Sequence, residues 1–199
     1  MNSVAAGPDG QLRCPWALSA PEYLSYHDIE WGQPVTSVSG LYERMSLEAF
    51  QSGLSWITIL RKRENFRAAF DGFQPDRVAA YGQPEIERLL RDAGIVRNQA
   101  KITAAIANAR IIAEWGQGFA DLVWSFHDPD RPRPGSLSDL PATSPAATAL
   151  SKQLRKRGIR FLGPTTAYAT MQAVGVVDDH LADCFVRVPR LSRGAGDTE

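Results

Sequence analysis

The sequence predicts an all-α fold, on three observations. Apolar residues recur with a helical period of about 3.6, and no segment shows the alternation of apolar and polar residues that marks a strand. Proline and glycine stand where these periodic segments begin and end. Hydrophobic residues make up 44% of the 199 residues, which is enough to bury a core. We expect one functional unit over 1–199, with a folded domain of about 12–188 and short flexible ends.

The first two predicted helices form a pair joined by a tight turn. One helix opens near Ser39 and ends at Ser52, where Gly53 supplies the left-handed residue that commonly follows a helix. The next helix has Ser55 as its N-cap and runs through WITILRKRENFRAAF, residues 56–70.

A second pair of helices is predicted further along the chain. Its first helix has Pro84 at the first position and stops at Gly94, and Asn98 opens a long second helix. The sequence GIVR lies between them, so these segments form a helix, a hairpin and a helix.

The segment after residue 127 is predicted to be an exposed connection. It contains five prolines within 128–145, and prolines at this density exclude a continuous helix. Two more helices follow, one from Ser144 and Pro145 to Gly158 and one from Pro164 to Gly175.

Composition gives no global indication of a partner. The chain has 22 basic and 22 acidic residues, so a net charge of zero provides no long-range attraction to nucleic acid. Two basic triplets, 61–63 and 155–157, could form a local binding face or could be ordinary solvated helix surface. The chain lacks the roughly 18-residue apolar run of a membrane span, and its start lacks a signal sequence. We expect a cytoplasmic protein without a membrane partner.

Two cysteines and two histidines have the spacing of metal ligands. Cys14 and His27 lie near one end of the chain, and His180 and Cys184 lie near the other, four residues apart, where a helix would bring both side chains to one face. Cys2His2 sets favour tetrahedral zinc, and a complete four-ligand shell is structural. The alternative is that all four are ordinary core residues.

Glu48 stands on the apolar face of its helix. It lies three residues after Met45 and seven after Leu41, so it shares their stripe. A buried carboxylate is costly unless it meets a partner or a ligand, which marks a candidate site. A structural salt bridge is the alternative. Aromatic residues concentrate around this helix, as expected for a pocket that holds an extruded base or for simple core packing.

These segments together resemble a known family. YLSYHDIEWG, LYERMSLEAFQSGLSWITILRKRENFRAAF, DAGIVRNQAKITAAIANAR and MQAVGVVDDHLADC are similar, in this order, to DNA-3-methyladenine glycosylase I from about Cys14 to Cys184. The resemblance implies the helix-hairpin-helix glycosylase fold with one structural Zn²⁺ that ties the chain ends together.

The resemblance also implies roles for individual residues. The zinc ligands fall on Cys14, His27, His180 and Cys184. The base-recognition carboxylate falls on Glu48. The pocket aromatics fall on Tyr26 and Trp56, with Trp16 and Tyr23 nearby, and Leu54 matches the wedge that fills the gap left by a flipped nucleotide.

The hairpin over 94–101 resembles the family's DNA-binding element. Backbone amides from Gly94 onward would approach phosphates, with Arg97 and Lys101 alongside. The sequence departs from the family pattern in Gln99-Ala100, which gives this hairpin a less basic ending, in Pro164 where threonine is usual, and in Asp178 where asparagine is common.

The resemblance therefore implies a monomeric repair enzyme that releases 3-methyladenine from alkylated double-stranded DNA. Alkylation at N3 makes adenine cationic and an excellent leaving group, so little acid catalysis is needed. Two other classes remain open: a catalytically silent binder of damaged or bent DNA, which has no need of Glu48, and a zinc-stabilised protein-interaction module, which has no need of Leu54.

Overall fold

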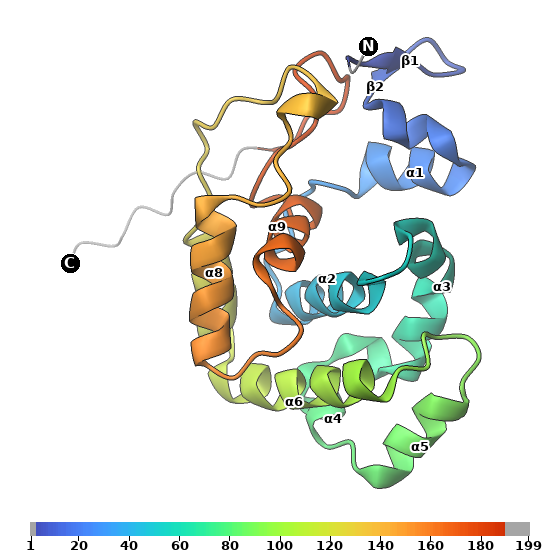
Figure 1. Ribbon diagram of the computed structural model, residues 1–199, viewed down its shortest axis with the longest axis vertical. Coiled ribbons are helices and arrows are strands. Elements are labelled where there is room, and N and C mark those ends of the chain that lie inside the picture. Colours follow the sequence, from blue (N-terminus) through green and yellow to red (C-terminus); the bar gives the residue numbers. More distant parts are fainter. Residues whose placement is uncertain (1–2, 190–199) are drawn as a thin grey trace, which may run out of the picture.

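A computed structural model describes residues 3–189, and its regular secondary structure is helical apart from two short strands, which confirms the all-α prediction (Figure 1). Its elements, in chain order, are β1 (Ala5–Ala6), β2 (Leu12–Arg13), α1 (Pro21–Ile29), α2 (Val38–Gln51), α3 (Trp56–Ala69), α4 (Pro75–Ala79), α5 (Gln83–Arg91), α6 (Gln99–Trp115), α7 (Gln117–Trp124), α8 (Pro145–Lys156) and α9 (Pro164–Ala173). Three short 3-10 turns, Pro15–Ser19, Asp71–Phe73 and Leu137–Asp139, complete them.

The two strands were not predicted. They are only two residues each and pair antiparallel, Ala5 with Arg13 and Ala6 with Leu12. So short a ladder leaves no periodic signal in a sequence. The flexible C-terminal end that the sequence predicts includes residues 190–199, which lie outside the described residues.

Helix α2 is central to the fold and contacts α3, α4, α6, α7 and α9 (Figure 1). It begins at Val38, one residue before the predicted start near Ser39, and the Ser37 hydroxyl caps it by accepting a hydrogen bond from the Gly40 amide at 3.2 Å. Leu41 and Met45 are buried in the main hydrophobic core, as the helical period predicted. The rigid centre of the molecule therefore carries Glu48.

The turn between α2 and α3 follows the prediction. Gly53 has a positive φ of 84°, and the Leu54 amide donates to the Gln51 carbonyl at 2.6 Å. The glycine lets the chain reverse at once, so Leu54 stands at the tip of the turn and is 42% exposed.

Helices α5 and α6 are joined by the hairpin 92–98. Pro84 is the second residue of α5, not the first, and α5 ends at Arg91, three residues before Gly94. Asn98 caps α6 as predicted, because its side chain accepts from the Lys101 amide at 3.1 Å.

The proline-rich segment after α7 contains no α-helix before Pro145, as predicted, and leads to α8 and α9. Gly175 follows α9 with a positive φ of 79°, and a Cβ at this position would lie 2.5 Å from the Gly32 carbonyl oxygen. This close approach places the C-terminal segment beside the end of α1. Within residues 3–189, none of the helices has the length and apolarity to cross a bilayer.

Candidate functional site

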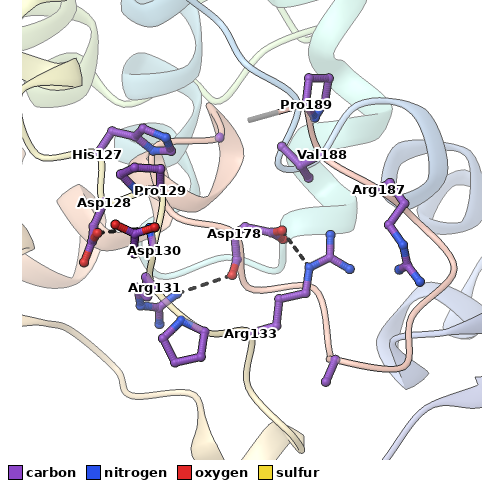
Figure 2. Close-up of a pocket in the computed structure, with 13 residues that line it drawn as sticks. His127, Asp128, Pro129, Asp130, Arg131, Arg133, Asp178, Arg187, Val188 and Pro189 are labelled. Atoms are coloured by element: carbon purple, nitrogen blue, oxygen red, sulfur yellow. Dashed lines mark hydrogen bonds and ion pairs between the residues drawn. The ribbon is translucent and has the colours of Figure 1, made fainter. Parts of the chain in front are cut away.

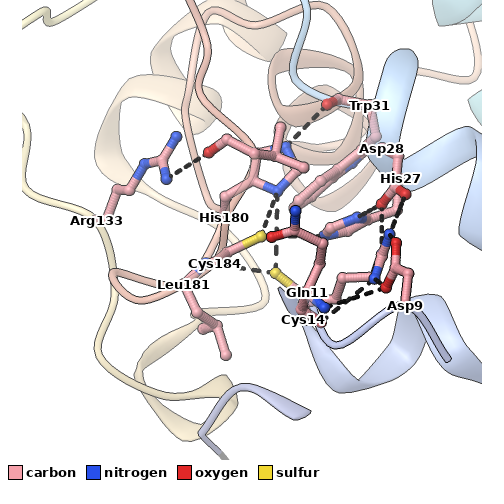
Figure 3. Close-up of polar contacts among 12 residues, drawn as sticks. Asp9, Gln11, Cys14, His27, Asp28, Trp31, Arg133, His180, Leu181 and Cys184 are labelled. Atoms are coloured by element: carbon pink, nitrogen blue, oxygen red, sulfur yellow. Dashed lines mark hydrogen bonds and ion pairs between the residues drawn. The ribbon is translucent and has the colours of Figure 1, made fainter. Parts of the chain in front are cut away.

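Cys14, His27, His180 and Cys184 converge from both ends of the described chain and are fully buried (Figure 3). Their potential ligand atoms all lie within 4.8 Å of one another. The Cys184 sulfur is 3.5 Å from His27 Nε2 and 3.7 Å from His180 Nδ1. Residues 180–184 form a turn, closed by the Cys184 amide on the Leu181 carbonyl, and not the expected helix. A turn also brings residues four apart together, so the pair still forms.

Both histidines of this Cys/His cluster are oriented by a second partner. His27 Nδ1 lies 2.8 Å from Asp28 Oδ1, and His180 Nε2 lies 3.0 Å from the Trp31 carbonyl oxygen. Since each of these ring nitrogens donates its proton outward, the other nitrogen presents a lone pair to the two sulfurs. Metal-binding histidines are held in this way.

One of the two sulfurs is favoured as a thiolate, because the hydrogen bond with Cys184 and burial raise the pKa of Cys14 while the pKa of Cys184 is lowered. The Leu181 amide donates to the Cys14 sulfur at 3.4 Å, and hydrogen bonding with Cys14 and with both histidines lowers the pKa of Cys184. Both cysteines are free thiols. The residues present therefore fit a metal ion in a closed, four-ligand site.

A second, open site lies next to the cluster, and its Trp16 and Trp31 rings contact His27 and His180. It is a cavity of about 320 Å³ formed mainly by α1, α2, the start of α3 and α9. Its lining residues are Trp16, Tyr23, Tyr26, Trp31, Glu48, Gln51, Trp56, Ala169 and Gln172, and we call it the aromatic pocket. Glu48 and the four aromatics Trp16, Tyr23, Tyr26 and Trp56, chosen from the sequence, thus come together here.

Glu48 is buried in this pocket, 7% exposed, and its carboxylate accepts no hydrogen bond from residues 3–189. Burial raises its pKa to about 8, and the charge of Arg44 offsets the effect only in part. Arg44 itself is held away by ion pairs to Glu30 at 2.6 Å and Glu43 at 2.9 Å. The salt-bridge alternative therefore fails for Glu48, since the neighbouring arginine pairs with other carboxylates.

The aromatic rings do not yet form a slot. Tyr26 and Trp56 have centroids 5.5 Å apart and planes inclined by 45°. A base held between two rings needs parallel planes about 7 Å apart, twice the usual contact distance. A planar ligand must therefore either lie against one of these rings or move one aside.

Four lining residues were not selected from the sequence: Trp31, Gln51, Ala169 and Gln172. Trp31 belongs to the aromatic concentration noted around α2. Ala169 and Gln172 come from α9, far away in sequence, and only the contact of α9 with α2 brings them here. No local motif could have marked them.

The hairpin has fewer unpaired hydrogen-bond donors available to phosphates than the sequence predicted. The Gly94 amide donates to Asp92 Oδ1 at 2.7 Å. Lys101 Nζ donates to the carbonyls of Phe50 at 2.9 Å and Ser52 at 2.6 Å, at the end of α2. The structure thus uses Gly94 and Lys101 internally. Among the described residues, Arg97 is exposed and its side chain has no partner.

The basic triplet 61–63 is likewise engaged. Arg61 pairs with Glu22, Lys62 donates to the Ala93 carbonyl at 2.8 Å, and Arg63 pairs with Glu30. Its side chains hold α3 against α1 and the hairpin, so it is not a free basic surface.

Another cavity, of about 350 Å³, lies between the proline-rich segment and the C-terminal segment (Figure 2). Two of its three arginines form ion pairs: Arg133 Nε lies 2.7 Å from Asp178 Oδ2, and Arg131 Nη1 lies 2.7 Å from Asp179 Oδ1. Asp178, a departure from the family pattern, thus anchors the proline-rich segment to the segment carrying His180.

Comparisons with known proteins show the family of this chain. A family model described as methyladenine glycosylase matches residues 16–187. This chain belongs to the methyladenine glycosylase family. Among curated members, DNA-3-methyladenine glycosylase 1 of Escherichia coli (strain K12) is 48% identical over 177 residues, covering 86% of this chain and 95% of that protein. DNA-3-methyladenine glycosylase of Haemophilus influenzae is 42% identical, covering 86% and 96%.

Solved structures of the family share the fold. A crystal structure of 3-methyladenine DNA glycosylase I has a TM-score of 0.83 and 48% identity, covering 87% of this chain and 98% of that chain. A variant of 3-methyladenine DNA glycosylase I in complex with 3-methyladenine has a TM-score of 0.80 and 35% identity, covering 86% and 95%.

Proposed function

We propose that this protein is a DNA glycosylase that hydrolyses the bond between 3-methyladenine and deoxyribose in alkylated duplex DNA. The observation that carries the proposal is the aromatic pocket, in which Glu48 is buried without a partner among residues 3–189, in a chain that belongs to the methyladenine glycosylase family. The relatives' names and the bound 3-methyladenine of one structural neighbour support the choice of base.

Recognition depends on charge. In the empty pocket Glu48 is mostly protonated at neutral pH, because burial raises its pKa to about 8. A cationic base next to it favours the ionised form, since opposite charges stabilise each other in a poorly solvated site. An alkylated adenine therefore gains an attraction that neutral adenine lacks. Glu48 accepts hydrogen bonds from the base edge, and the base lies against the ring of Tyr26 or Trp56, with Trp16 and Tyr23 nearby.

The base reaches the pocket by leaving the stack. Leu54, exposed at the tip of the α2–α3 turn, is placed to occupy the gap in the duplex. The helix-hairpin-helix element formed by α5, 92–98 and α6 follows the phosphate backbone, with Arg97 as the unpaired cation of the hairpin itself. Lys101 fixes the carbonyls at the end of α2 and thus holds the turn that carries Leu54.

In the chemical step, water forms a bond to the anomeric carbon of the sugar as the bond from that carbon to the purine nitrogen breaks. The bonding electrons neutralise the cationic purine, and the proton of the water passes to solvent. The cation makes the base a good leaving group, so binding and orientation supply the catalysis.

We assign the Cys/His cluster to one structural Zn²⁺. The two sulfur and two nitrogen donors, buried and oriented by Asp28 and the Trp31 carbonyl, match the preference of zinc. All four positions of a tetrahedral shell are supplied by the protein, so the ion links the two ends of the described chain and stays out of the reaction. We place the enzyme in the cytoplasm and expect it to act as a monomer on double-stranded DNA that contains alkylated purines.

The test is direct. Purified protein is incubated with methylated duplex DNA, and released bases are identified by chromatography against standards. We expect 3-methyladenine. Binding of the same DNA without any released base would support the silent-binder alternative, and neither binding nor release would favour the interaction module.

A further inference from the structure

Gln172 is the polar residue that α9 contributes to the lining of the aromatic pocket, to which α2 contributes Glu48. Its amide nitrogen Nε2 donates to Asp179 Oδ2 at 2.7 Å. A carboxylate only accepts hydrogen bonds, so this contact fixes which end of the amide is nitrogen and which is oxygen. The carbonyl oxygen Oε1 has no partner among the described residues.

Asp179 is itself held from three sides. Its side chain is completely buried and accepts from Arg131 Nη1 at 2.7 Å, from the Tyr168 hydroxyl at 2.6 Å and from Gln172. Arg131 comes from the proline-rich segment, so this carboxylate joins three parts of the chain. A group with so many donors does not rotate freely. Gln172 is therefore positioned by a rigid anchor, whereas the Gln51 side chain in the same pocket has no partner within residues 3–189.

We infer that Gln172 is a specificity-determining residue that accepts a hydrogen bond from the exocyclic amino group of the bound base. This inference rests on the proposed function and names the edge that is recognised. An amino group carries two N–H donors, and among the acceptors of the pocket Glu48 is a carboxylate and Gln172 has a carbonyl whose orientation is fixed, whereas Gln51 is unanchored. A purine with an amino group at position 6 satisfies both acceptors.

A 6-oxo purine presents an oxygen at the same place. The fixed carbonyl of Gln172 would then face another acceptor, and neither would be satisfied. The pocket should therefore favour 3-methyladenine over 3-methylguanine, although both are cationic N3-alkylated purines. Charge selects the alkylated base, and Gln172 selects adenine among alkylated bases.

The test measures a ratio of two products in one reaction. Methylated duplex DNA carrying both 3-methyladenine and 3-methylguanine is incubated with enzyme under single-turnover conditions, and both bases are quantified. In Gln172→Met, which keeps the length of the side chain and removes the amide, we expect the preference for 3-methyladenine to fall about five- to tenfold, as for one lost hydrogen bond. Because both products come from the same protein, the ratio is independent of the folded fraction.

Two further variants separate recognition from stability. Tyr168→Phe removes another donor to Asp179 without touching the pocket, so it should lower stability and keep the wild-type ratio. Asp179→Asn allows the Gln172 amide to turn over, so it should lower the ratio as Gln172→Met does, at a metal content equal to wild type. An unchanged ratio in Gln172→Met and Asp179→Asn overturns the inference and leaves the proposed function standing. Failure of wild-type protein to release 3-methyladenine rejects the proposed function itself.

Discussion

The Cys/His cluster and the aromatic pocket are neighbours in the fold, and residues that are adjacent in sequence belong to the two regions. On α1, His27 belongs to the cluster and Tyr26 lines the pocket. In the C-terminal segment, His180 belongs to the cluster while Asp179 holds Gln172. Because the same backbone segments carry both regions, the difference in their roles must come from their side chains.

The difference concerns hydrogen-bonding partners. In the cluster, both outer ring nitrogens have partners and the inner atoms face one another. In the pocket, the Glu48 carboxylate, the Gln172 carbonyl and the buried Trp56 indole nitrogen have none among residues 3–189. Unsatisfied buried polar groups are costly, and a fold retains them where a ligand completes them. Buried polar groups that all have hydrogen-bonding partners, as in the cluster, indicate a structural role. Buried polar groups without partners, as in the pocket, indicate a ligand-binding role.

Removing one ligand of the Cys/His cluster should have the largest effect on stability and metal content. Cys184→Ser removes one of the four ligands that join the ends of the described chain, so we expect loss of the metal and destabilisation by several kcal/mol. Zinc is quantified by metal analysis and stability by urea unfolding. Native protein without zinc, or a variant as stable as wild type, would contradict a structural metal.

The buried Glu48 carboxyl of the aromatic pocket should make the stability of the protein depend on pH. The pKa of Glu48 rises from 4.5 to about 8 in the folded protein, so between these values the folded state binds a proton that the unfolded state has lost. Stability from this group is present at low pH and is lost as pH rises to about 8, by at most about 4 to 5 kcal/mol.

Glu48→Gln removes this titration without changing the size of the side chain. The stability of the variant relative to wild type should therefore increase from pH 5 to 8 and level off above. Urea unfolding of both proteins over this range measures the difference. Parallel curves would show that Glu48 does not carry a buried, titrating carboxyl.

Variants at the surface should have smaller and distinguishable effects. Leu54→Ala should slow excision from duplex DNA about tenfold, as for loss of a buried apolar wedge, and leave the salt dependence of binding unchanged. Lys101→Ala should act in the same direction more weakly, because Nζ supports the turn that carries Leu54.

Arg97→Ala is the matched phosphate variant. It should reduce the slope of log affinity against log salt by about one unit, with little change in excision once the DNA is bound. Equal salt slopes for wild type and Arg97→Ala would contradict a phosphate contact of Arg97. A reduced salt slope in Lys101→Ala would show that Lys101 contacts phosphate after all.

The sequence predicted the parts of this molecule that depend on local periodicity or on rare residues. The helical period placed Glu48 on the buried face of α2, and the scarcity of cysteine and histidine singled out the four cluster residues. Turn chemistry placed Gly53 and Asn98 correctly. These signals are local, so they survive without knowledge of the fold.

What depends on tertiary packing could not be predicted. Gln172 carries no motif, and its orientation depends on Asp179, Tyr168 and Arg131, which come together only in the fold. Lys101 was expected to lie beside phosphate because the hairpin over 94–101 resembles the family's DNA-binding element. The end of α2 lies within its reach, and carbonyl groups there take up two of its donors.

The measurement that tests the account most directly is made on Glu48→Ala. Single-turnover release of 3-methyladenine, normalised to folded protein, is combined with the free energy of unfolding and the metal content of the same preparation. We predict excision slowed by tens of fold or more, as for a charge-assisted contact of roughly 2–3 kcal/mol, with unchanged metal and no loss of stability. Excision within about twofold of wild type together with a less stable protein would contradict the account, because Glu48 would then support the fold and not the base.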